Sequence, residues 1–190
     1  MNKRVYPGWQ YNLLVQRGKR RIKNIYLRNQ IVIAHCEFPV SIRKDENAKD
    51  IMHISATMAG IAFSNSGTAA AHALGHSFGA TFHVTHGTSV GLFLIPTIKY
   101  NSQDQQTREK YLRVSRILGA HDIESLIKVI KDFFTSVGQP IRVKDLGIDK
   151  GEYESKLENM VVLSLRDSEL AFNPVLMGEE DLKKLILENY

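Results

Sequence analysis

The stretch that decides the fold spans residues 72–87 and reads HALGHSFGATFHVTHG. It contains four of the chain's seven histidines, His72, His76, His83 and His86. His72 and His76 are four residues apart, so on one helix they share a face, with Cβ atoms about 5 to 6 Å apart. The pattern therefore predicts a helix that presents two imidazoles together and ends near His83.

The residues around these histidines indicate a metal site. Gly87 lets the chain turn after His86, which can return His86 toward the space that His72 and His76 face. Neutral imidazoles bind divalent transition metals at about 2.0 to 2.1 Å, in sites whose ligands converge from different segments. Small residues that let a second helix or a ligand approach closely are Ala69, Ala70, Ala71, Gly75, Gly79 and Ala80. The alternative is a tightly packed helix pair whose histidines are satisfied inside the core.

The sequence on both sides of this stretch predicts helices. Asp122 and Asp149 are candidate N-caps, and Gly138 followed by Pro140 is a stop signal. A break is expected at residues 64–67 and an interruption at 85–87. The helices expected from apolar spacing are 48–63, 68–82, 88–100, 104–118, 122–137, 149–165 and 179–190. We therefore expect an all-α domain over residues 48–190.

Residues 1–47 differ from the rest and form a basic segment of uncertain structure. The first 50 residues carry eleven basic and four acidic side chains, whereas residues 51–190 carry fourteen and sixteen, so the overall charge of +5 arises near the N-terminus. The segment holds a turn-rich aromatic cluster at 6–11 with Trp9, expected to be a packing anchor, and a basic run at 16–23. The β-branched run IVIAH at 31–35 favours a strand. A basic arm of this kind could contact phosphates.

Composition limits the class of protein. A chain of 190 residues with 43% hydrophobic content can bury roughly two-thirds of its unfolded surface. Its apolar runs are shorter than the roughly 18 residues of a membrane span, and its N-terminus lacks an apolar signal core. The single cysteine, Cys36, excludes an internal disulfide. We expect a soluble, cytoplasmic protein with no membrane partner.

The histidine stretch belongs to a longer run that resembles a known family. Residues 58–96 read MAGIAFSNSGTAAAHALGHSFGATFHVTHGTSVGLFLIP. This run is similar to the signature region of the iron-containing (group III) alcohol dehydrogenases, in which MAG-x-AFSN-x-G precedes H-x-x-x-H-x-x-G and then HG. LGI at 146–148 and AFNPVLMGEEDLKKLI at 171–186 are similar to that family's closing helices. The resemblance covers about residues 48–190.

The resemblance implies a helical C-terminal metal-binding domain. In that family an N-terminal α/β domain binds NAD(P), and one aspartate and three histidines ligate the metal. Two of these histidines match His72 and His86, and the histidine that matches His76 lies beside the substrate and the nicotinamide. The resemblance thus implies Fe2+ or Zn2+ at His72 and His86, with His76 as a candidate for relaying the hydroxyl proton of a small alcohol. His83 would lie behind the ligands or line the pocket.

The sequence departs from the family at the other two ligands. These are an aspartate and a histidine four residues later, in a D-A-x-x-H-A-x-E context, and no aspartate of this chain is followed by histidine at that spacing. His35, in IAHCEF, has a different context. A glycine-rich phosphate loop between a strand and a helix is also lacking. We therefore expect weak metal binding and little dehydrogenase turnover by this chain alone, as in a C-terminal fragment of such an enzyme.

Three functions remain open on the sequence. The first is an iron-containing alcohol dehydrogenase-like oxidoreductase, and the second is a non-catalytic helical metal-binding or assembly module. The third makes the basic arm the active part and the helical body a scaffold for contact with nucleic acid. Apolar helix faces would drive formation of a homo-oligomer or association with a cofactor domain. His53 and His121 stand alone and are expected at ordinary helix-face and helix-start positions.

Overall fold

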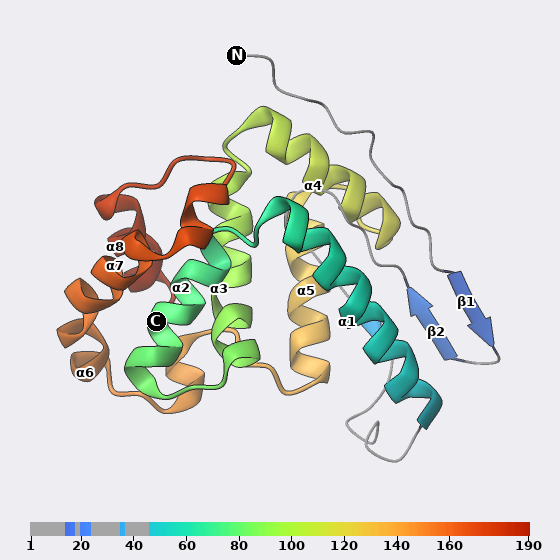
Figure 1. Cartoon of the computed structure of the whole chain (residues 1–190), viewed down its shortest axis with the longest axis horizontal. Coiled ribbons are helices and arrows are strands. Elements are labelled where there is room, and N and C mark those ends of the chain that lie inside the picture. The colour runs from blue at the N-terminus through green and yellow to red at the C-terminus, as the bar shows by residue number, and fades with distance from the viewer. Residues whose placement is uncertain (1–13, 18–19, 24–34, 37–45) are drawn as a thin grey trace. The chain divides into compact units, whose positions relative to one another are not determined.

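The computed structural model describes residues 14–17, 20–23, 35–36 and 46–190 (Figure 1). Residues 1–66 and residues 67–190 form two separate compact units. The described part of the first unit contains β1 (Leu14–Arg17), β2 (Arg20–Lys23), β3 (His35–Cys36) and α1 (Glu46–Ser66). The strands form an antiparallel sheet in the order β1-β2-β3, in which Leu14 lies opposite Lys23 and Ile22 opposite Cys36.

Part of the basic segment thus forms strands. The basic run contributes the end of β1 and all of β2, while its residues 18–19 lie outside the described residues. Of the run IVIAH only His35 is described, and the aromatic cluster with Trp9 also lies outside. The function of this segment and the boundary between residues 47 and 48 stay predictions.

The second unit is helical, which confirms the all-α prediction for the larger part of the chain. Its elements are α2 (Ala70–Phe82), α3 (His86–Asn101), α4 (Gln105–Ile117), α5 (Ile123–Ser136), η2 (Val143–Leu146), α6 (Lys150–Ser155), α7 (Leu157–Arg166), η3 (Ser168–Phe172) and α8 (Glu179–Glu188). Within the described residues, no helix is both long and apolar enough to cross a membrane.

Two local differences from the sequence prediction bear on function. The single helix expected over residues 149–165 is divided at Lys156 into α6 and α7. His86 and Gly87, expected in the interruption between two helices, form the first turn of α3 after the N-cap Thr85. The connection from α2 to α3 is therefore only residues 83–85, and His86 has a fixed helical position.

Aspartate side chains begin several of these helices, as the sequence indicates. Asp122 accepts a hydrogen bond of 2.7 Å from the backbone N–H of Ser125 at the start of α5. Asp149 accepts one of 3.0 Å from the backbone N–H of Glu152 at the start of α6. Each carboxylate satisfies an N–H that has no partner inside the helix, and the predicted caps are confirmed.

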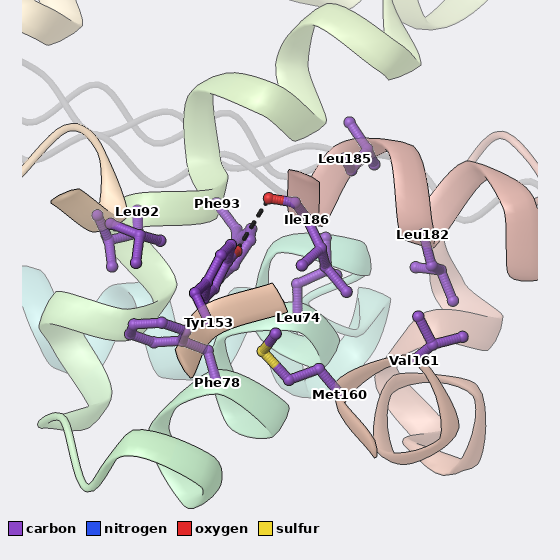
Figure 2. Packing of buried hydrophobic residues seen from close by; sticks show 11 residues of the cluster. Leu74, Phe78, Leu92, Phe93, Tyr153, Met160, Val161, Leu182, Leu185 and Ile186 are labelled. Atoms are coloured by element: carbon purple, nitrogen blue, oxygen red, sulfur yellow. Dashed lines mark hydrogen bonds between the residues drawn. The ribbon is translucent and has the colours of Figure 1, made fainter. Parts of the chain in front are cut away.

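The apolar core of the second unit holds α2 and α3 against the C-terminal helices (Figure 2). The ring of Phe78 on α2 makes edge-to-face contacts with Phe93 of α3 and with Tyr153 of α6. Tyr153 is fully buried, and its hydroxyl donates a hydrogen bond of 2.9 Å to the Ile186 carbonyl of α8. Burying each such side chain contributes about 1.5 to 3 kcal/mol. This packing fixes the backbone of α2, the helix that carries His72 and His76.

Candidate functional site

Three imidazole rings from α2 and α3 lie next to one another. The centroids of His72 and His76 are 5.7 Å apart, those of His72 and His86 are 5.4 Å apart, and those of His76 and His86 are 5.2 Å apart. His72 and His76 share a face of α2 because they are one helical turn apart. We call these three residues the histidine cluster. It brings together three side chains of a type that binds metal ions.

Small residues of α2 allow α3 to come close enough to add His86. A Cβ atom built on Gly75 would lie 2.8 Å from the Cα atom of Val90, and one on Gly79 would lie 3.0 Å from the Ser89 hydroxyl. Real side chains do not tolerate 2.8 Å to a backbone atom, so glycine at residue 75 is a steric requirement of the helix crossing. The small residues predicted to make room are thus used for helix packing beside the cluster.

The connection between the two helices also has a special backbone. His83 ends α2 in the left-handed region, with φ of 55°, and its side chain is exposed. This conformation reverses the chain within three residues and is uncommon for a residue with a Cβ atom. The structure therefore places His83 at a helix end, where its backbone does the turning, and its side chain is not one of the three rings of the histidine cluster.

Two acidic residues that the sequence analysis did not single out adjoin the cluster. Asp167, the N-cap of η3, places Oδ2 at 2.7 Å from Nδ1 of His76. Glu169, two residues later, accepts hydrogen bonds from the backbone N–H and the hydroxyl of Thr68, just before α2. We call Asp167, Ser168 and Glu169 the acidic turn. The Asp-x-Glu pattern at a helix start was the available signal, but it does not indicate which distant segment the carboxylates contact.

The electrostatics keep one imidazole of the cluster neutral. Burial lowers the pKa of His72 from 6.5 to about 4, with further lowering by the neighbouring His86 and His76 that exceeds the opposing effect of Glu169 and Asp167. A neutral imidazole has a free lone pair on one ring nitrogen, which is the form that binds a metal. His72 is therefore available as a ligand at neutral pH without first losing a proton.

The donor set fits part of a metal site. Two imidazoles bound to one tetrahedral cation at about 2.0 to 2.1 Å have ring centroids roughly 5 Å apart, close to the 5.4 Å between His72 and His86. Within the part of the chain that the structure describes, no group of three or more His, Cys, Asp or Glu side chains is arranged to hold a metal ion. All three pairs of the histidine cluster, at 5.2 to 5.7 Å, are near this separation, while the described residues do not form a complete metal site.

The remaining histidines lie apart from the cluster in the chain. His53 is exposed on α1, and His121 is exposed just before α5, where its backbone N–H donates to the Ser125 hydroxyl. Both have the ordinary positions that the sequence predicts. His35 is in β3, and its side chain lies outside the described residues.

The model of the Fe-containing alcohol dehydrogenase family, C-terminal, matches residues 28–190. The chain belongs to the iron-containing alcohol dehydrogenase family. The match begins upstream of residue 48, where the sequence resemblance began.

Individual relatives agree with this assignment. An alcohol dehydrogenase from Thermococcus barophilus is 34% identical over 147 residues, which cover 77% of this chain and 38% of the relative. An NADPH-dependent butanol dehydrogenase from Clostridium saccharobutylicum is 27% identical over 151 residues, 76% of this chain and 38% of the relative. The crystal structure of an iron-containing alcohol dehydrogenase from Thermococcus thioreducens matches with a TM-score of 0.73 at 34% identity, covering 80% of this chain and 39% of that one. The chain thus spans about two-fifths of the length of these relatives.

Proposed function

We propose that this chain supplies the metal-side and substrate-side helices of an NAD(P)-dependent oxidoreductase that interconverts small alcohols and aldehydes. His72 and His86 are the two ligands that the chain offers to Fe2+ or Zn2+. His76 exchanges the hydroxyl proton of the substrate. The observation that carries the proposal is the histidine cluster itself. Its three rings have centroid distances of 5.2 to 5.7 Å and lie where α2 and α3 pack closely together.

Each histidine suits its proposed role for a different reason. His72 is partly buried and neutral, which suits a ligand. The side chain of His76 is 40% exposed, so its ring can meet a substrate. A divalent cation, when bound, supplies Lewis-acid chemistry to the alcohol or carbonyl oxygen. His76 then needs only to hold or accept a proton at the ring nitrogen that Asp167 does not contact.

The cofactor and the remaining ligands are proposed to come from protein outside this chain's described helices. NADPH dependence is stated in the name of the butanol dehydrogenase relative, and that relative is more than twice as long as the matched region. We propose that the chain acts with a cofactor-binding domain, through association or as one part of a longer protein. The choice between NAD and NADP and the identity of the alcohol belong to that domain and the shared pocket.

A second candidate function is a non-catalytic metal-binding or assembly module. It is favoured by one observation, that among the described residues no group of three or more His, Cys, Asp or Glu side chains is arranged to hold a metal ion. In that case the chain binds a divalent cation weakly and shows no NAD(P)-dependent alcohol oxidation, even with metal and cofactor added.

Metal content tests the ligand assignment. Protein purified without added metal is analysed for iron and zinc, and Zn2+ binding is titrated by calorimetry. We expect the His72→Ala, His86→Ala double variant to lose most of the bound metal. A His53→Ala, His121→Ala variant is the control. It removes two histidines outside the cluster and should keep the bound metal. Equal metal in the wild type and the His72, His86 variant removes both residues from the ligand list.

Activity separates the two candidate functions. Oxidation of a simple primary alcohol is followed by the absorbance of the reduced nicotinamide, with Fe2+ or Zn2+ and NAD or NADP present. The dehydrogenase function predicts turnover once a cofactor domain of a relative is supplied in trans, and predicts that His76→Gln lowers kcat more than it lowers metal content. If the chain binds metal but shows no turnover under any of these conditions, the dehydrogenase function is contradicted and the non-catalytic binding module is supported.

A further inference from the structure

We propose that Asp167 is a positioning residue that holds His76 in one orientation and one tautomer, with the proton on Nδ1 and the lone pair on Nε2. This inference deepens the proposed function and rests on the assignment of His76 as the residue that exchanges the substrate's proton. The observation behind it is the 2.7 Å contact between Asp167 Oδ2 and His76 Nδ1.

The chemistry of the contact decides which atom donates. An ionised carboxylate has no proton to give, so it can only accept a hydrogen bond. At 2.7 Å the imidazole Nδ1 must therefore carry the proton. In a neutral imidazole only one nitrogen is protonated, so Nε2 is left as the acceptor. Nε2 is then the atom that can take a hydroxyl proton.

The carboxylate that makes this contact is itself fixed on its other side. Asp167 Oδ1 accepts a hydrogen bond of 2.8 Å from the backbone N–H of Glu169, which is the N-cap interaction of η3. The two oxygens thus have separate partners, one in the backbone and one in the imidazole. The Asp167 side chain is 16% exposed, against 40% for His76. The Asp167 carboxylate is therefore largely buried, while the His76 ring remains accessible to solvent.

Two further contacts keep the acidic turn in register with α2. Glu169 accepts from Thr68, which fixes the residues just before α2. On the other side, the Ser164 hydroxyl of α7 donates a hydrogen bond of 2.9 Å to the hydroxyl of Ser77, the residue after His76. Both serines are buried, so this bond is shielded from water. The segment that carries Asp167 is thus bound to α2 before and after His76, which limits how far the carboxylate and the ring can separate.

The substitution Asp167→Asn tests the role without removing the helix cap. Asparagine caps a helix about as well as aspartate, so η3 should persist. The amide can donate a hydrogen bond to Nδ1 and so stabilise the opposite tautomer, as the equivalent change does in serine proteases. Asp149→Asn is the matched control, because Asp149 is also an N-cap, accepting from Glu152, on α6.

The primary readout is the tautomer, measured by two-bond 1H–15N correlation spectra of metal-free protein labelled with 15N-histidine. His76 is assigned by comparison with His76→Gln. We expect a protonated Nδ1 and an unprotonated Nε2 in the wild type and in Asp149→Asn, and loss of that preference in Asp167→Asn. A wild-type His76 whose proton is on Nε2 overturns the inference, as does an unchanged pattern in Asp167→Asn.

Kinetics provide the second readout and keep the two proposals distinguishable. In the reconstituted enzyme we expect Asp167→Asn to lower kcat by up to about 10²- to 10⁴-fold, the range that a general acid–base residue contributes, with metal content unchanged. If the tautomer is as stated but neither Asp167→Asn nor His76→Gln affects kcat, the proposed catalytic function of His76 fails while the hydrogen-bond assignment stands. If His76→Gln abolishes turnover and Asp167→Asn leaves both kcat and the tautomer unchanged, the positioning role alone fails.

Discussion

The side-chain amide of Asn189 donates a hydrogen bond of 3.1 Å to the carbonyl oxygen of Leu92. Leu92 lies four residues before Pro96, a proline inside α3. Because proline has no N–H, the Leu92 carbonyl cannot receive the usual helical bond from residue 96. Asn189 is buried just beyond α8 and supplies the missing donor. The last residues of the chain thus complete the helix that carries His86.

Removal of this donor should destabilise the fold in a way that depends on Pro96. We expect Asn189→Ala to lower the free energy of unfolding by about 1 to 3 kcal/mol, because a buried carbonyl loses its partner. In a Pro96→Ala background the backbone of residue 96 can donate to Leu92, so the same change should cost at least about 0.5 kcal/mol less. This coupling is measured by urea unfolding, followed by circular dichroism, of four proteins. They are the wild type, Asn189→Ala, Pro96→Ala and the double variant. Equal costs in both backgrounds contradict the assigned role of Asn189.

The crossing of α2 and α3 should be sensitive to a single methyl group. We expect Gly75→Ala to lower the free energy of unfolding by about 1 to 3 kcal/mol, because its Cβ would lie 2.8 Å from Val90. Gly87→Ala is the control, since none of the described atoms lies within 4 Å of a Cβ at that helical position. The control should be neutral or slightly stabilising. A thermal shift of the same sign and size for both variants would show that helix propensity, not the crossing, determines the effect.

A buried hydroxyl on α3 offers a stabilising change. Among the described residues, the Thr97 hydroxyl is buried with no hydrogen-bond partner. Thr97→Val replaces it with a methyl group of similar shape and should raise the free energy of unfolding by about 1 kcal/mol. Thr107→Val is the matched control, because the Thr107 hydroxyl is hydrogen-bonded to Asp104 and its loss should destabilise. Calorimetric melting temperatures check both, and a lower value for Thr97→Val would reveal a partner for its hydroxyl.

The stability of the fold should also decrease at alkaline pH. Burial raises the pKa of Tyr111 from 10.0 to about 12. Between these values the unfolded chain loses the phenolic proton while the folded chain keeps it, so stability falls as pH rises from 10 to 12. The contribution of Tyr111 to this slope is at most about 1.4 kcal/mol per pH unit. Unfolding titrations at several pH values should show a shallower slope for Tyr111→Phe, and an identical slope rules out the contribution.

The sequence predicted the candidate site in part. The shared face of His72 and His76 follows from their spacing within one helix, and the small residues around Gly75 indicated a close approach. The helical position of His86 was missed, because a His-Gly pair in isolation favours a turn, whereas Thr85 begins α3 one residue earlier. The break at Lys156 was also missed, because the apolar spacing continues through it.

The sequence by itself determined the approximate extents of most helices, the caps Asp122 and Asp149, and the pairing of two imidazoles on α2. All of these depend on residues a few positions apart, because helical periodicity determines which of them share a helix face. Only the tertiary structure decided that Asp167 meets His76 across 91 residues and that Asn189 meets Leu92 across 97. Such contacts arise from how helices pack, and local periodicity carries no information about which distant segments will pack together.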